Sequence, residues 1–304
     1  MNSKPSHAYP SPMIDTWRVR KLDDKEEILA FLQKDRFYAT YAIGDLEPDF
    51  FPRCEWFAAG AGGHIQALAL HFTGLDPHIL FTMGANDGLA LILGSALRPE
   101  RVYFTGRSEH LPAIRAFYSL GEIKKMLRMT VRNEDFRPVS GKALKLSPGY
   151  SSELKRLYSL GESRGESVIA FSPYQLAQGV FYGIEKRGRL IAAAGTHLVA
   201  PTYGLAAVGN VFTDPDYRRR GYATLCTSAV TRELLAQGLD VVLNVQEGNA
   251  DAIHIYEKLG YREYCRFIEV LGVRKGLGRN KDPWGFQNPR DLLGIKQHIK
   301  EKTG

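Results

Sequence analysis

The segment VFTDPDYRRRGYAT, residues 211–224, is the most specific part of the sequence. An apolar run ends in it, a turn containing Pro215 follows, and three consecutive arginines and Gly221 then open a stretch with helical spacing. The first turn of a helix has backbone N–H groups without intrahelical acceptors, and the helix macrodipole adds positive potential there. Arginines oppose that dipole, so their presence predicts a bound phosphate, with a solvated basic turn as the alternative.

Two common phosphate-binding motifs, the P-loop and the dinucleotide fingerprint, do not match this segment. It has no GK[ST] triplet, which excludes a P-loop, and no GxGxxG pattern, which excludes a dinucleotide fingerprint.

The residues around this loop predict a mixed α/β order, in which helices connect neighbouring strands. In the late part of the chain we expect strands at 180–186, 190–199, 205–213, 241–245 and 262–270, and helices at 151–163, 224–237 and 249–259. In the early part we expect helices at 24–34, 89–97 and 113–121, and strands at 56–59, 65–72, 79–82 and 102–104.

A short internal repeat relates the two parts. The nonapeptide that begins at Ala113 recurs at Ala252, at an offset of 139 residues (252 − 113), with Ala, Ile, Leu and Gly in register and Phe117 opposite Tyr256. Gly and Pro residues between 133 and 149 indicate a boundary. We therefore predict a leader at 1–15, an early half at 16–135, a late half at 142–270 and a basic tail at 271–304.

Two motifs together resemble the GCN5-related N-acetyltransferases (GNAT). Arg218-x-x-Gly221-x-Ala223 resembles the acyl-CoA loop [RQ]-x-x-G-x-[GA] of that superfamily, and Asn249-x-x-Ala252-x-x-x-Tyr256-x-x-x-Gly260-Tyr261 resembles its second signature. The likeness covers about residues 142–270 and is closest to the FR47-like branch. It implies a tandem GNAT-like α/β fold with a complete late half and a degenerate early half.

The resemblance also implies which residues would hold acetyl-CoA, the expected cosubstrate. The family's third strand diverges from its neighbour, and the pantetheine arm lies in that opening. The implied contacts are Asn210, Val211, Phe212, Thr213, Arg218, Arg219, Arg220, Gly221, Tyr222, Ala223, Thr224, Asn249 and Tyr256.

Tyr256 matches the position of the family's general acid. A phenol, with an ordinary pKa near 10, stays protonated at neutral pH and can donate to a departing thiolate. A core aromatic on a helix is the structural alternative. The early half has Phe117 at the matching position, and residues 83–88 (MGANDG) where a basic loop is needed, so it is expected to be non-catalytic.

The general base is less well defined, because the strand predicted at 205–213 has no carboxylate. His197 and Glu247 are the candidates, and an amine that arrives neutral would need no base. His254 is expected on the surface. The predicted activity is N-acetyl transfer to an amine, and the alternative is an acyl-CoA-binding sensor or interaction protein without turnover.

Composition and charge limit the remaining function classes. The 304 residues carry a net charge of +7 and three cysteines, with neither a disulfide framework nor a zinc-ligand spacing, so no metal is expected. Residues 271–304 hold eight Lys or Arg against three acids. This basic excess outside the predicted body argues against a nucleic-acid-binding module, which is the third function considered. We expect a cytoplasmic monomer or homodimer without a membrane span.

Overall fold

The long strands of the late half are apolar on both faces, unlike strands with one side in water. Nearly every residue from Leu190 to Thr196 and from Leu205 to Val208 is buried. Such strands are typical of a sheet that is covered on both sides.

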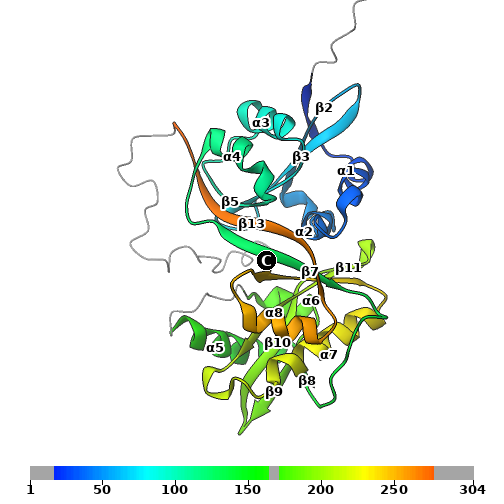
Figure 1. The fold of residues 1–304 in the computed structure, drawn as a ribbon, viewed down its shortest axis with the longest axis vertical. Coiled ribbons are helices and arrows are strands. Elements are labelled where there is room, and N and C mark those ends of the chain that lie inside the picture. Colours follow the sequence, from blue (N-terminus) through cyan, green and yellow to red (C-terminus); the bar gives the residue numbers. More distant parts are fainter. Residues whose placement is uncertain (1–16, 164–170, 277–304) are drawn as a thin grey trace, which may run out of the picture.

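The computed structural model describes residues 17–163 and 171–276 (Figure 1). The early half contains β1 (Arg18–Leu22), α1 (Lys25–Leu32), α2 (Thr40–Gly44), β2 (Cys54–Ala61), β3 (His64–Phe72), β4 (His78–Gly84), α3 (Asn86–Ser95), β5 (Arg101–Gly106), α4 (Leu111–Phe117), β6 (Tyr118–Leu120) and β7 (Lys124–Val131). The late half contains β8 (Leu144–Lys145), α5 (Ser151–Glu162), α6 (Pro173–Gln178), β9 (Tyr182–Lys186), β10 (Arg189–Ala200), β11 (Leu205–Thr213), α7 (Tyr222–Ala236), β12 (Asp240–Gln246), α8 (Ala250–Lys258) and β13 (Arg262–Arg274).

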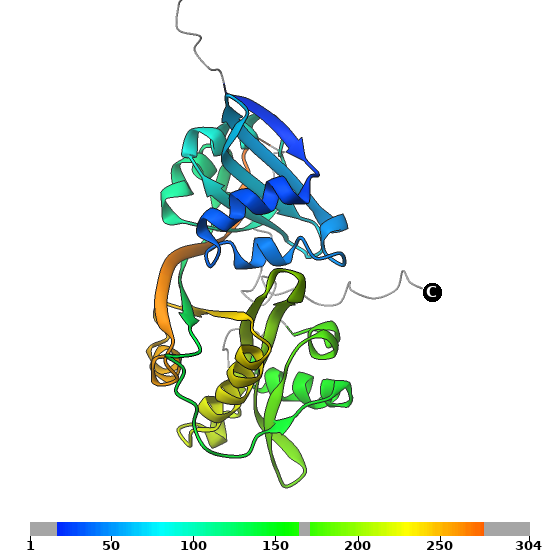
Figure 2. The same cartoon turned by 90° about the vertical axis from the view of Figure 1, so that its right-hand side faces the viewer.

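The two halves share one mixed sheet. Within the described residues its strand order is β1-β2-β3-β4-β5-β13-β7-β12-β11-β10-β9-β8, and β6 also pairs with β13. Figures 1 and 2 show β7 and β13 crossing the middle of the molecule. The last strand of the late half therefore lies beside β5 of the early half, and β7 lies beside β12 of the late half.

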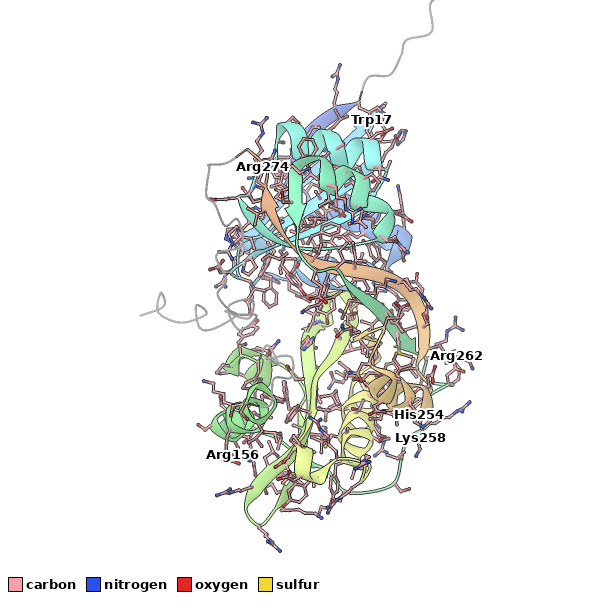
Figure 3. The ribbon with its side chains drawn as sticks, turned by 60° about the vertical axis from the view of Figure 1, so that its left-hand side comes forward. Trp17, Arg156, His254, Lys258, Arg262 and Arg274 are labelled. Atoms are coloured by element: carbon pink, nitrogen blue, oxygen red, sulfur yellow. The ribbon has the colours of Figure 1, made fainter. Side chains whose placement is uncertain are left out.

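The internal repeat explains this exchange of strands. The offset of 139 residues (252 − 113) relates β5 to β12 and β7 to β13. The central strand of the early half, β5, lies beside β13, the last strand of the late half. The central strand of the late half, β12, lies beside β7, the last strand of the early half. Each half has therefore exchanged its last strand for the counterpart from the other half. Figure 3 shows the two ends of β13, with Arg262 among the late half and Arg274 among the early half.

Different elements cover the two faces of the late part of the sheet. Leu127, Val208 and Leu243 pack in one core with side chains of α7 and α8, and we call this side the α7 face. On the opposite face, α5 and α6 cover β10, while Ala207 and Val242 pack with the early half around Ile43. The early half thus forms part of the cover of the late half.

Most predicted elements are confirmed to within a few residues, with two corrections. The helix expected at 113–121 ends at Phe117, because the chain then extends and pairs with β13 as β6. The strand expected at 262–270 continues to Arg274, so the first residues of the expected tail belong to the sheet. The leader and residues 277–304 of the tail lie outside the described residues.

Two other properties concern the described part of the chain. None of its helices is both long and apolar enough to cross a bilayer. It also contains no group of three or more His, Cys, Asp and Glu side chains that could hold a metal ion.

Asp45, which follows α2 between the two halves, gives a prediction on stability. Burial raises the pKa of its carboxyl from 3.8 to about 8. The native state therefore keeps a proton that the unfolded chain releases near pH 4, so the stability of the wild type falls as pH rises from about 4 to about 8. Asp45→Asn is expected to raise Tm more at pH 8 than at pH 5, measured by thermal unfolding. An equal change at both pH values would contradict the assignment.

Candidate active site

Strands β11 and β12 diverge halfway along their length. They pair in parallel only from Leu205 opposite Asp240 to Val208 opposite Leu243. Beyond that point β11 remains paired with β10 as far as Thr213, and β12 remains paired with β7 as far as Gln246. We call the opening between residues 209–213 and 244–246 the late splay.

A β-bulge shapes the β11 side of the late splay. The register between β10 and β11 shifts at this point, and Asn210 has a φ of +51°, which is uncommon for a residue with a side chain. Its backbone N–H donates to His197 Nε2 at 3.3 Å, and its carbonyl accepts from the Tyr158 hydroxyl at 2.9 Å. The bulge thereby turns this peptide away from the ladder.

Two buried polar atoms of β11 have no hydrogen-bond partner within the described part of the chain. They are Oδ1 of Asn210 and Oγ1 of Thr213, both beside the late splay. Buried polar atoms are nearly always hydrogen-bonded in native structures. Both atoms fit an expected ligand whose arm carries amide groups.

The start of α7 provides an uncapped helix N-terminus at the end of β11. Gly221 is the N-cap, with a φ of +79°, and no side chain in residues 17–163 or 171–276 caps the helix. A Cβ at Gly221 would meet no atom of the described residues within 4 Å, so they leave space open in front of it. The amides of Tyr222, Ala223 and Thr224 have no backbone acceptor among the described residues. This arrangement fits a phosphate group.

The three arginines of the loop differ in their settings. Arg218 folds back along β11, where its Nε donates to the carbonyl of Thr213 at 3.2 Å and its guanidinium lies 5.5 Å from the Phe212 ring centroid. Arg219 and Arg220 are exposed, and Arg219 has a φ of +60°. Positive φ at a non-glycine residue is a form of strain that clusters at ligand sites.

The remaining expected contacts of the loop lie at the same end of β11. Val211 packs toward α7, and Phe212 packs toward α5 on the opposite face. Tyr222 is half-buried, with Lys186 Nζ 5.1 Å from its ring centroid.

Tyr256 is buried on α8, but its hydroxyl has no hydrogen-bond partner among the described residues. Burial raises its pKa to about 12, so it is protonated at neutral pH. The neighbouring Tyr261, whose ring centroid is 6.0 Å away, instead bonds Thr231 at 2.8 Å. Asn249 caps α8 by accepting from the amide of Ala252 at 3.2 Å.

The structure places both candidate bases in existing interactions. His197 Nε2 accepts from Asn210, so its Nδ1 carries the proton toward the Tyr41 hydroxyl at 3.3 Å. Surrounding protein lowers the pKa of His197 to about 4, so the ring is neutral at pH 7. Glu247 pairs with Arg266 at 2.7 Å. His254 is exposed, as expected (Figure 3).

The early half has an equivalent opening, the early splay, because β4 and β5 pair only from His78 to Phe81. Here the Tyr38 hydroxyl bridges the diverging strands. It donates to the carbonyl of Thr82 at 2.7 Å and accepts from the N–H of Arg107 at 3.0 Å. A side chain of the protein therefore makes the backbone contacts that an extended ligand would make.

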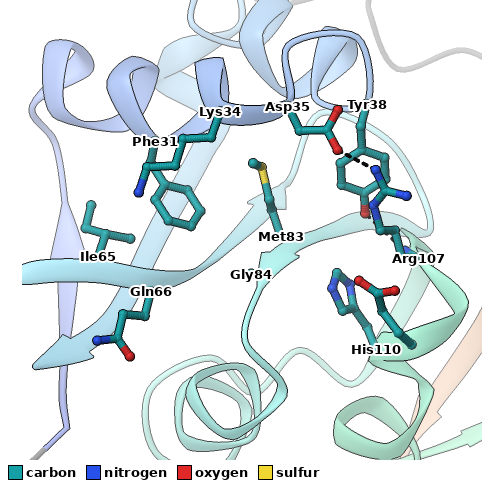
Figure 4. A pocket seen from close by; sticks show the side chains of 11 residues that line it. Phe31, Lys34, Asp35, Tyr38, Ile65, Gln66, Met83, Gly84, Arg107 and His110 are labelled. Atoms are coloured by element: carbon teal, nitrogen blue, oxygen red, sulfur yellow. Dashed lines mark hydrogen bonds and ion pairs between the residues drawn. The ribbon is translucent and has the colours of Figure 1, made fainter. Parts of the chain in front are cut away.

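The helix that follows β4 is also unsuited to phosphate. Asn86, its first residue, donates to the carbonyl of Glu109 at 2.7 Å, and Asp87 places a negative charge in the first turn. A cavity of about 500 Å³ does lie at this end of the early half, where the Arg107–Asp35 ion pair stands beside Tyr38 (Figure 4). None of the residues predicted for acetyl-CoA lines it.

Comparison with known proteins finds matches to the late half. Residues 181–268 match the FR47-like protein family. Mycothiol acetyltransferase from Tsukamurella paurometabola is 38% identical over 28% of this chain and 29% of its own length. An Escherichia coli enzyme named [ribosomal protein bS18]-alanine N-acetyltransferase is 32% identical over 32% of this chain and 64% of its own length. This chain thus spans less than two thirds of either relative.

A solved structure resembles the whole arrangement. It is a tandem GNAT protein from the clavulanic acid biosynthesis pathway, with a TM-score of 0.54 and 12% identity, covering 86% of this chain and 100% of that chain. At this identity the likeness concerns the fold. The chain therefore has the fold of the GCN5-related N-acetyltransferases, and its residues 181–268 match the FR47-like protein family.

Proposed function

We propose that the late half transfers an acetyl group from acetyl-CoA to an amine. The observation that carries this proposal is the late splay, which leads directly to the uncapped N-terminus of α7. An extended acyl arm and a diphosphate would need these two features side by side. The names of the two relatives, both acetyltransferases, support the same reaction.

Different residues of the late half would bind different parts of acetyl-CoA. The amides of Tyr222, Ala223 and Thr224 would bind the diphosphate, and Gly221 lets it approach the backbone. The arm would lie in the late splay, where Asn210 and Thr213 offer their unpartnered polar atoms. Arg218, Arg219 and Arg220 supply positive charge.

The reaction needs one bond to form and one to break. The amine nitrogen bonds the carbonyl carbon of the thioester, the carbon–sulfur bond breaks, and the amine loses a proton while the thiolate gains one. The Tyr256 hydroxyl, with a pKa of about 12, would donate a hydrogen bond to the sulfur as negative charge develops.

Among the residues that the structure describes, the late splay offers no unengaged acceptor for the proton of the amine. Strand β11 carries no carboxylate, and both His197 and Glu247 are engaged. This observation favours a second candidate function, that of an acyl-CoA sensor without turnover. Acetyl transfer remains possible without a general base if the acceptor binds as the neutral amine.

The test combines binding and turnover. The purified chain is titrated with acetyl-CoA by calorimetry and then incubated with acetyl-CoA and a mixed panel of amines. We expect binding, amine-dependent release of CoA detected with a thiol reagent, and an acetylated amine in the mass spectrum. Binding without turnover on any amine would favour the sensor, and absence of binding would refute both functions.

A further inference from the structure

Arg128, on β7 of the early half, is a buried cation that forms no ion pair within the described residues, although the charge of Glu269 acts on it from a distance. Only 4% of the residue is exposed. Its Nε donates to Asn244 Oδ1 at 2.9 Å, and its Nη1 donates to the carbonyls of Phe37 and Tyr38 at 2.9 and 2.7 Å. No ion pair joins it to a carboxylate of the described residues, whereas buried charges are normally paired. Its Nη2 makes no hydrogen bond to a described residue.

Arg128 lies next to the late splay. It is opposite Asn244 in the register of β7 and β12, just past the last pair between β12 and β11. Leu127 and Leu243 point to the α7 face, so Arg128 and Asn244 point to the opposite face, because side chains alternate along a strand. An amine entering from this face would meet the acyl group from the side away from Tyr256 on α8.

A chain of contacts crosses this face from one diverging strand to the other. The guanidinium of Arg128 lies 5.1 Å from the centroid of the Tyr41 ring, and the Tyr41 hydroxyl contacts His197, which in turn binds Asn210. Tyr41 and Asn244 are half-buried, and His197 is exposed. The early half supplies two of the residues that make these contacts, Tyr41 and Arg128.

The polar groups of this chain of contacts define the chemistry of a ligand. A guanidinium only donates, so the Asn244 atom that accepts from it is the oxygen, and the Asn244 Nδ2 is left as a second donor. Nη2 of Arg128 and Nδ2 of Asn244 thus form a pair of donors suited to the two oxygens of a carboxylate. The apolar rings of Tyr41 and Phe267 beside the guanidinium strengthen such a pair by excluding water.

We propose that Arg128 and Asn244 bind a carboxylate of the acceptor, so that the acceptor is a small amine that carries a carboxylate, such as an amino acid. This rests on the proposed acetyl transfer and specifies its substrate class. It also gives the early half a role, since Arg128 and Tyr41 complete the acceptor site of the late half.

The test uses matched acceptors with the wild-type chain. The twenty amino acids are compared with their amides and their decarboxylated amines, with acetyl-CoA as donor and mass-spectrometric detection. We expect kcat/KM for the best amino acid to exceed that for its amide by at least ~100-fold, since a site built for a polar group rejects analogues that lack it. An amide or decarboxylated amine acetylated as well as its amino acid would overturn the inference and leave the transferase function intact.

A variant separates binding of the acceptor from binding of acetyl-CoA. Arg128→Gln is expected to raise KM for the amino acid and abolish the preference over the amide, while Arg128→Lys, which keeps the charge, retains part of it. Arg132→Gln, at an exposed arginine that directly follows β7 and is paired with Glu134, is the control and should change neither. An unchanged preference in folded Arg128→Gln would refute the role of Arg128. If wild type binds acetyl-CoA but acetylates no member of the panel, the inference also fails, whereas loss of acetyl-CoA binding itself refutes the proposed function.

Discussion

Gly221→Glu is expected to weaken acetyl-CoA binding by roughly 10³-fold while the chain stays folded. The side chain would occupy the open space in front of the α7 N-terminus and place a negative charge where a diphosphate would bind. Losing two charge-assisted hydrogen bonds of about 2 kcal/mol each accounts for a loss of this size. The measurement is calorimetric titration, with circular dichroism to show that the fold persists.

The same helix offers a matched control at its other end. Gly238 has a φ of +73°, close to that of Gly221, and a Cβ there would also meet no atom within 4 Å. Gly238→Glu therefore carries the same type of backbone strain, but far from the expected diphosphate. We expect its affinity for acetyl-CoA to remain at the wild-type level. Equal losses in both variants would mean that strain, and not the ligand site, causes the effect.

Tyr256→Phe is expected to lower kcat by about 10²- to 10⁴-fold, the usual contribution of a positioned acid, and to change acetyl-CoA affinity little. Its hydroxyl has no protein partner among the described residues, so its removal should not lower stability. Because its pKa is about 12, the wild-type kcat should not fall through loss of this proton as pH rises from 7 to 10. The measurement is steady-state kinetics with a saturating acceptor.

Tyr261→Phe is the control for the chemistry of the hydroxyl. Tyr261 is adjacent and more deeply buried, but its hydroxyl is bonded to Thr231. Its loss should lower the free energy of unfolding by about 1 kcal/mol and leave kcat within a few-fold of wild type. A wild-type kcat in Tyr256→Phe would remove Tyr256 as the acid.

The late half could be predicted closely because its signals are local. A strand, a turn with Pro215, Gly221 and a helix follow one another within residues 205–236, and each is determined by neighbours in the chain. The N-cap at Asn249 and the surface position of His254 are of the same kind.

The exchange of strands could not be predicted in this way. β7 and β13 are counterparts in the repeat, so either has the apolar pattern needed beside β5 or β12. Their choice of partner depends on the packing of the whole molecule. For that reason the juxtaposition of Arg128 with Asn244, and of Tyr41 with His197, leaves no local trace in the sequence.

In the early half, too, contacts between distant segments could not be predicted from the sequence. Its lack of a basic loop is visible at residues 83–88, but the bridge made by the Tyr38 hydroxyl depends on a contact between distant segments. The bridge strengthens the expectation of a non-catalytic half, since it occupies the place of an extended arm in the early splay.

Hydrogen exchange with mass spectrometry shows whether acetyl-CoA binds in the late splay, because the exchange of both splays is measured in one sample. With saturating acetyl-CoA, we expect slower amide exchange in peptides covering residues 209–225 and unchanged exchange in those covering residues 82–90. Protection of residues 82–90, or no change at 209–225 while acetyl-CoA is bound, would contradict the account.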